Sequence, residues 1–155
     1  MGKFIIRGLF SAIIVVFTVC CAFANNTHVV KQNIIRQAKA MGVEPAIMLS
    51  IAKAESGFNQ NARGGGGQHI GVFQLSQATA KNMGLNPYNL DDNIKGGIIY
   101  YKRMYDKLGS MELAVAAYNV GPDTIIRCNK TIPKYTQNFV NRIMADYKYY
   151  KKSVL

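Results

Sequence analysis

Residues 44–58 read EPAIMLSIAKAESGF, the most informative segment of the 155-residue chain. Glu44 and Pro45 fit the first turn of an α-helix, and Ile47, Met48 and Ile51 recur at helical spacing. The pattern predicts a helix that ends at about Ser56. Glu55 therefore lies at the C-terminal end of this helix, where the helix dipole disfavours a negative charge.

Glu55 differs in this respect from the other seven carboxylates. Its position, together with its apolar neighbours, predicts a raised pKa and hence a protonated side chain suited to general acid catalysis. The alternative is an exposed glutamate paired with Lys53 or Arg63, and the local sequence favours neither. The other carboxylates fit first turns of helices (Glu44, Asp91, Asp92, Glu112 and Asp123) or polar faces (Asp106 and Asp146).

The flanking sequence predicts one mainly α domain. A helix over 29–41 precedes the one that carries Glu55, and residues 57–72, with the run Gly64–Gly67, predict an irregular or hairpin loop. This loop separates the second and third helices. Further helices are expected over 76–83, from Asp91 or Asp92 as N-cap to about 108, from a Ser110 cap to 120, over 123–128 and from Pro133 towards Tyr150.

Residues 1–24 have the features of a cleaved export signal. Lys3 and Arg7 precede a short apolar run, and small residues at 22–24 suit cleavage after Ala24, which leaves 25–155 as the mature domain. The protein is therefore expected in the periplasm or outside the cell. The alternative, a retained membrane anchor, is disfavoured because the run is shorter than about 20 residues. A lipoprotein is disfavoured because Cys20 and Cys21 each follow a residue that is not small.

Loss of Lys3 and Arg7 leaves 17 basic residues against 8 acidic ones, a formal charge of +9, which suggests an anionic partner. The basic residues are scattered and the protein is expected outside the cytoplasm, so the polyanionic cell wall fits better than nucleic acid. A generally solvated basic surface is the alternative. Cys128, the remaining cysteine of the mature chain, cannot form an intrachain disulfide and is expected to be a small buried residue rather than a reactive thiol.

Three ordered motifs point to a known family. Residues 55–58 (ESGF), 71–75 (GVFQL) and 117–122 (AYNVGP) resemble the motifs of lytic transglycosylases with a soluble-lysozyme-like domain. Residues 78–80 and the positions Asp91, Asn93, Ile94 and Gly97 also follow the family's pattern, so that the resemblance extends from about 29 to 143.

The resemblance implies a mainly helical lysozyme-like fold with a cleft for strands of alternating N-acetylmuramic acid and N-acetylglucosamine. On the family's mechanism, Glu55 protonates the glycosidic oxygen after muramic acid and then, as a base, deprotonates the 6-hydroxyl of that sugar, which closes a 1,6-anhydro ring. Ordinary glycosidases need a second carboxylate. None is evident here, and the substrate's own acetamido group takes over that role in the family.

The resemblance also assigns substrate-binding residues. Tyr118 corresponds to a tyrosine near the catalytic carboxylate, Asn119 to a sugar-binding asparagine, and Gln74 to a glutamine that binds acetamido or hydroxyl groups. Ser56 is expected to orient the catalytic loop, and Phe73 to line the cleft floor beside Val72, at a position where methionine is more common. Tyr118 and Asn119 have an alternative as a core aromatic residue and a helix C-cap.

Two segments depart from the family's pattern. The run Gly64–Gly67, with Gln68 and His69, replaces a turn that contains serine and proline, which suggests a mobile loop. Tyr135-Thr136 stands where a glutamate-threonine pair is frequent, so a secondary acidic group is missing. Phe139-Val140 stands in place of a tyrosine-valine pair.

No cofactor or metal is expected, because His28 and His69 are far apart and lack further ligands at suitable spacing. We expect a monomer that binds peptidoglycan glycan strands and opens the wall locally for a secretion, conjugation or pilus machine. A hydrolytic lysozyme would share the fold and the substrate. A non-catalytic wall-binding assembly factor is the alternative from another functional class.

Overall fold

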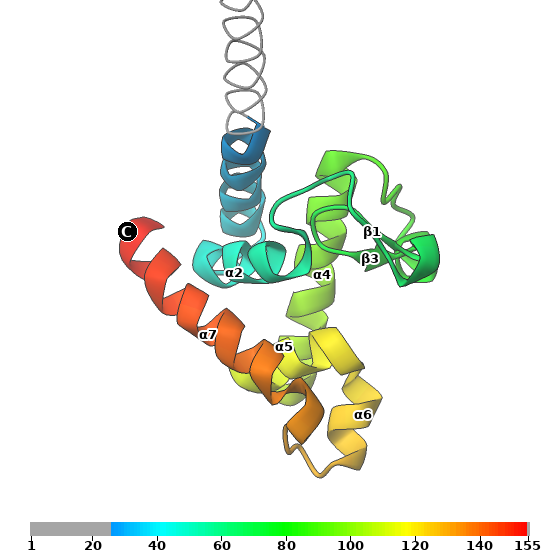
Figure 1. Cartoon of the computed structure of the whole chain (residues 1–155), viewed down its shortest axis with the longest axis vertical. Coiled ribbons are helices and arrows are strands. Elements are labelled where there is room, and N and C mark those ends of the chain that lie inside the picture. The colour runs from blue at the N-terminus through cyan, green and yellow to red at the C-terminus, as the bar shows by residue number, and fades with distance from the viewer. Residues whose placement is uncertain (1–25, 155) are drawn as a thin grey trace, which may run out of the picture.

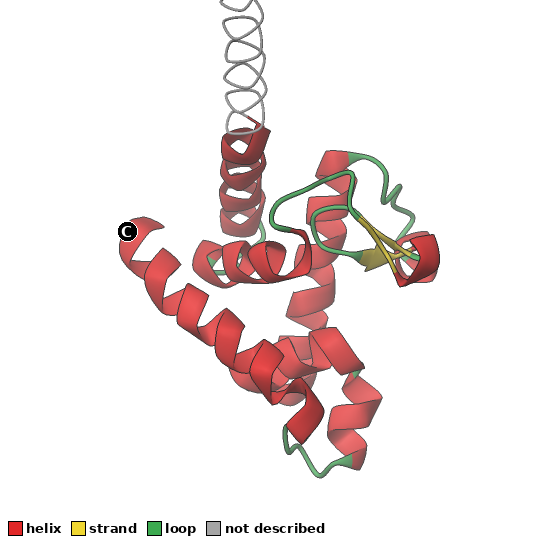
Figure 2. Ribbon diagram, viewed as in Figure 1, coloured by secondary structure: helices red, strands yellow, loops and turns green. Residues whose placement is uncertain are grey.

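The computed structural model describes residues 26–154, which are mostly helical (Figure 1, Figure 2). The expected export signal, residues 1–24, lies outside the described residues. Within the described part, no helix is both long and apolar enough to cross a bilayer. The mainly α, lysozyme-like fold expected from the sequence is confirmed, including the hairpin between the second and third helices.

Helix α2 (Pro45–Ser56) is the centre of the core. Seven consecutive residues, Ala46–Ala52, are buried, and a helix that is apolar on every side has to lie inside the domain. The polar exception, Ser50, donates a hydrogen bond from Oγ to the carbonyl oxygen of Ala46 at 2.7 Å. Helix α7 (Lys134–Val154) packs against α2 (Figure 1). The first helix, described from 26 to 40, precedes α2 in the chain.

Three further helices build the rest of the helical body: α4 (Leu90–Leu108), α5 (Met111–Val120) and α6 (Pro122–Arg127). Ser110 caps α5 as expected, because its side chain accepts a hydrogen bond from the backbone N–H of Leu113. The expected cap of α4 is wrong. Asn89 accepts the hydrogen bond from the N–H of Asp92, so Asp91 and Asp92 lie in the first turn of the helix, where the dipole favours their charges.

The glycine-rich region forms a small antiparallel sheet. Its strands are β1 (Arg63–Gly64), β2 (His69–Ile70) and β3 (Leu75–Ser76), in that order, with the 3₁₀ turn Gly65–Gly67 between the first two. Helix α3 (Gln77–Asn82) follows directly and is capped by Ser76. The sheet and α3 form a lobe beside α4 (Figure 2).

A buried asparagine fastens this lobe to α4. The Asn93 side chain is fully buried and donates to the carbonyl oxygens of Ile70 (2.8 Å) and Pro87 (3.0 Å), while its Oδ1 accepts from the N–H of Phe73 (3.0 Å). Each buried backbone group left without its partner would cost about 1–3 kcal/mol. A Cβ at Gly71 would lie 2.6 Å from Asn93 Nδ2, so only glycine leaves room for this arrangement.

The expectation that Cys128 is buried is wrong. Cys128 is exposed at the C-terminal end of α6. Of the residues of this short helix only Ile125 is buried, so α6 has just one side chain in the core and its end projects into solvent.

Candidate active site

A cavity of about 310 Å³ lies between the sheet lobe and the helices α2, α4 and α5. It brings together residues that are far apart in the sequence. Four of the expected site residues line it, namely Glu55, Gln74, Tyr118 and Asn119. The other lining residues are Gly64, Gly65, His69, Leu75, Ser76, Thr79, Tyr100 and Gly121.

Glu55 is the only carboxylate among the described residues that line this cavity. It occupies the last turn of α2, next to Ser56, where the buried helix reaches the cavity. Burial raises the pKa of Glu55 to about 7, and the positive charge of Arg142 opposes this rise only in part. The carboxyl group is therefore largely protonated below neutral pH, as a general acid requires.

The alternative reading of Glu55 as an exposed, paired glutamate is excluded. Lys53 binds Asp146 instead, at 2.6 Å, and Arg63 donates to the carbonyl oxygens of Gln60 and Ala62. Within the described residues, no lysine, arginine or histidine nitrogen lies within 4.0 Å of the Glu55 carboxylate. The charge of Glu55 is thus left without an ion-pair partner beside the cavity.

Tyr118 crosses from α5 to the sheet lobe. Its hydroxyl donates a hydrogen bond to the carbonyl oxygen of Phe73 at 3.0 Å, and its ring packs edge-to-face on Tyr100 with centroids 5.1 Å apart. Burial, and then the nearby charge of Glu55, raise the pKa of Tyr118 well above its usual value. Tyr118 is therefore a neutral phenol whose oxygen lone pairs remain available as acceptors.

Gln74 is held in an unusual backbone conformation, with φ of 45°. Its side-chain amide donates to the carbonyl oxygen of Gly71 at 2.9 Å, which leaves Oε1 as the free acceptor. A Cβ at Gly64 would collide with this Oε1. A Cβ at Gly65 would lie 2.7 Å from Cδ2 of His69. The glycine run therefore gives space to two side chains of the cavity wall.

Asn119 is oriented by a residue that the sequence did not reveal as functional. The Thr136 side chain is fully buried, and its hydroxyl donates to Oδ1 of Asn119 at 2.8 Å. The Nδ2 donors of Asn119 are then free for a ligand in the cavity. The sequence contained one indication of this role. Thr136 matches the threonine of the glutamate-threonine pair that is frequent in the family, whereas Tyr135 stands in place of the glutamate.

Two expected substrate contacts do not line the cavity. Ser56 donates from Oγ to the carbonyl oxygen of Val72 (2.8 Å) and accepts from the N–H of Asn59 (3.1 Å), so it orients the catalytic loop. Phe73 does not form the cleft floor, because its ring is fully buried against Gly97 of α4. Both residues support the cavity-lining segments without lining the cavity themselves.

The described residues contain no group of three or more histidine, cysteine, aspartate or glutamate side chains that could hold a metal ion. Among the described residues, the cavity offers one carboxyl group, that of Glu55, beside amide and hydroxyl groups and the His69 imidazole. Such a lining suits a neutral ligand rich in hydroxyl and amide groups, and the single carboxyl group can give and then take back one proton.

Comparisons with known proteins agree with this description. The sequence profile of the family described as Transglycosylase SLT domain matches residues 32–139. A transglycosylase of Enterobacteria phage PRD1 is 32% identical over 80 residues, which cover 51% of this chain and 30% of the phage protein. The crystal structure of an inactive mutant of the lytic transglycosylase Slt from Pseudomonas aeruginosa superposes with a TM-score of 0.70 at 24% identity, covering 79% of this chain and 24% of that one.

The raised pKa of Glu55 predicts a pH-dependent effect of Glu55→Gln on stability. The folded protein binds this proton more tightly than the unfolded chain does, so wild-type stability falls as pH rises from about 4.5 through about 7. The variant lacks this loss. It should be more stable than wild type by about 2–3 kcal/mol at pH 8, with little difference at pH 4.5, because one pKa unit corresponds to about 1.4 kcal/mol.

Urea unfolding at both pH values measures this difference. The exposed Glu112→Gln serves as the matched control. It removes a charge from the first turn of α5, where the helix dipole favours it, so this variant should not be more stable than wild type at pH 8. An equal effect of Glu55→Gln at pH 4.5 and pH 8 would show that burial does not raise the pKa of Glu55.

Proposed function

Because the chain belongs to the transglycosylase SLT domain family, we propose that it is a peptidoglycan lytic transglycosylase that cleaves between N-acetylmuramic acid and N-acetylglucosamine. The chain spans less than a third of the phage transglycosylase and of the Pseudomonas enzyme. The observation that carries the proposal is that Glu55, whose pKa burial raises to about 7, is the single carboxylate among the described residues that line the cavity.

In the proposed reaction, the protonated Glu55 donates its proton to the glycosidic oxygen as the bond to the muramic acid carbon breaks. The glycan leaving group departs with this proton. The carboxylate then accepts the proton of the 6-hydroxyl of the same muramic acid, whose oxygen attacks the anomeric carbon and closes a 1,6-anhydro ring. One group thus serves as acid and then as base, and no water is consumed.

The composition of the cavity favours this route over hydrolysis. Retaining and inverting glycosidases place a second carboxylate about 5–5.5 Å or about 6.5–9.5 Å from the first. Among the described residues that line the cavity Glu55 is the only carboxylate, which disfavours both arrangements. The substrate's acetamido group can take the place of the second carboxylate, with Asn119 Nδ2 and Gln74 Oε1 available to hold amide groups.

Digestion of purified peptidoglycan tests the reaction. We expect mass spectrometry to detect muropeptides with 1,6-anhydro ends. We expect Glu55→Gln to lower the rate by at least about 10²-fold, because it removes the one carboxyl group among the described residues that line the cavity. Glu112→Gln, at an exposed site outside the cavity, should retain wild-type activity. Reducing ends in place of anhydro ends would instead indicate a hydrolytic lysozyme.

We further propose that the protein is exported to the periplasm with cleavage after Ala24. This rests on the two basic residues, the apolar run and the small residues of positions 1–24. The intact mass of protein recovered from the periplasmic fraction should correspond to residues 25–155. Recovery of the full-length chain in the membrane fraction would instead indicate a retained anchor.

We also propose a specialised role, in which the enzyme opens the wall locally for a secretion, conjugation or pilus machine. Deletion of the gene should then reduce assembly of that machine in the host, and wild type should restore it where Glu55→Gln does not. Full restoration by Glu55→Gln would identify a non-catalytic assembly factor. Immunoblots should show equal amounts of both proteins.

A further inference from the structure

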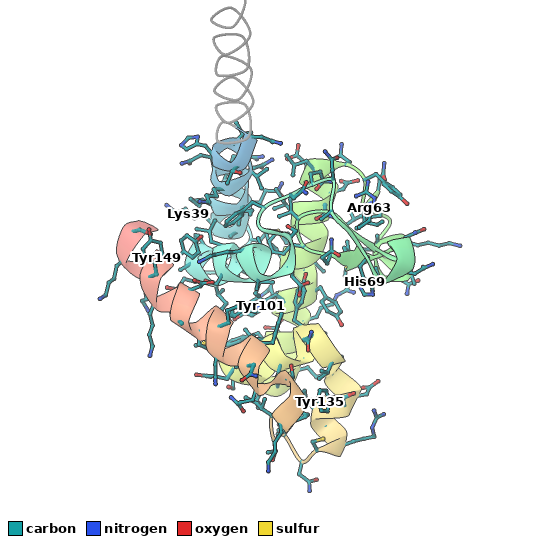
Figure 3. All side chains as sticks on the ribbon, viewed as in Figure 1. Lys39, Arg63, His69, Tyr101, Tyr135 and Tyr149 are labelled. Carbon is teal, nitrogen blue, oxygen red and sulfur yellow. The ribbon has the colours of Figure 1, made fainter. Side chains whose placement is uncertain are left out.

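His69 lies in the hairpin (Figure 3), lines the cavity and has no role in the proposed proton transfers. It belongs to β2, whose backbone pairs with β1 at Gly64 and with β3 at Ser76. The residue is exposed, yet its imidazole is held in place. Nδ1 lies 3.1 Å from the carbonyl oxygen of Gln74, and the Cδ2 edge lies against Gly65.

The first of these contacts defines which ring nitrogen carries the proton. A carbonyl oxygen can only accept a hydrogen bond, so Nδ1 must be the donor. In the neutral imidazole Nε2 then has a lone pair and is an acceptor. Within the described residues Nε2 has no hydrogen-bond partner, whereas Nδ1 has one.

The chain also keeps space for the ring. Gly65, which lines the cavity next to His69, has φ of 53°, and a Cβ there would lie 2.7 Å from Cδ2 and 3.4 Å from Nε2. A side chain at position 65 would therefore displace the imidazole or cover its outer nitrogen. The absence of a side chain keeps the Nε2 edge open to the cavity.

Two other cavity side chains likewise donate a hydrogen bond to a backbone carbonyl oxygen and keep an acceptor free. The Gln74 amide donates to Gly71 and the Tyr118 hydroxyl donates to Phe73, which leaves Gln74 Oε1 and the Tyr118 oxygen as acceptors. With His69 Nε2 the wall presents three acceptors, and Asn119 adds donors. Such a wall suits a ligand rich in hydroxyl and amide groups, which can donate protons to these acceptors. A carboxylate or phosphate group has few or no protons to donate.

We propose that His69 is a glycan-binding residue, whose Nε2 accepts a hydrogen bond from a hydroxyl or acetamido N–H of the sugar bound beside Glu55. This inference rests on the proposed function, since it names a further contact of the same substrate. The Nδ1 contact to Gln74 orients the ring for that purpose. The purely structural alternative is that His69 serves only to tie β2 to Gln74 through Nδ1.

Two substitutions separate the functions of the two nitrogens. His69→Asn places an amide near the position of Nδ1, so it keeps the donor to the Gln74 carbonyl and loses the outer acceptor. His69→Gln places an amide oxygen near the position of Nε2, so it keeps the acceptor and loses the inner contact. Thermal unfolding of both variants checks that each is folded at the assay temperature.

The assay measures kcat and KM on soluble, uncross-linked glycan strands, and Kd for the same strands in a Glu55→Gln background. We expect His69→Asn to raise KM and Kd about five-fold, the effect of one neutral hydrogen bond, with kcat changed less. His69→Gln should stay within about two-fold of wild type in KM and Kd, even where its melting temperature is lower.

Other outcomes overturn the inference. Wild-type KM and Kd in His69→Asn, or an equal loss in both variants, would show that Nε2 does not accept a hydrogen bond from the glycan. The failure of the proposed function looks different. A wild-type protein that binds strands but releases no cleaved product contradicts the lytic activity, and a His69-dependent Kd in the Glu55→Gln background would still support the contact.

Discussion

Burial of the Glu55 carboxyl group at the end of α2 is the constraint on which the site depends. A charged carboxylate loses its hydration there, and no lysine or arginine among the described residues pairs with it. The proton is therefore retained up to about neutral pH. The buried helix stabilises the fold through its apolar side chains, while the carboxylate at its end reduces the stability of the folded state at high pH.

Three other cavity side chains are oriented by backbone carbonyl oxygens. Gln74, Tyr118 and His69 each donate one hydrogen bond to such an oxygen, at Gly71, Phe73 and Gln74 respectively. Each side chain thereby keeps one defined orientation before a ligand binds. Groups that are already oriented lose less entropy on binding.

The lobe that contributes two of these groups has buried apolar side chains, among them Ile70 and Leu75. It is fastened to α4 by the buried Asn93, whose amide serves three backbone groups, and by the Phe73 ring packed on Gly97. The glycines at 64 and 65, which in the sequence suggest a mobile loop, make room for the Gln74 and His69 side chains. The role of these two glycines is steric, and it can be recognised only once the fold has brought Gln74 and His69 next to them.

The sequence alone predicts the order of the helices and the position of Glu55 near the end of an apolar helix, and the resemblance of its motifs to the family adds Gln74, Tyr118 and Asn119 as neighbours in the cavity. These follow from local periodicity, caps and ordered motifs. The contacts of Thr136, Asn93 and His69, the burial of Phe73 and the exposure of Cys128 emerge only from the folded structure. Each of these depends on contacts between residues far apart in the chain or on the path of the backbone in space, which spacing along one segment does not encode.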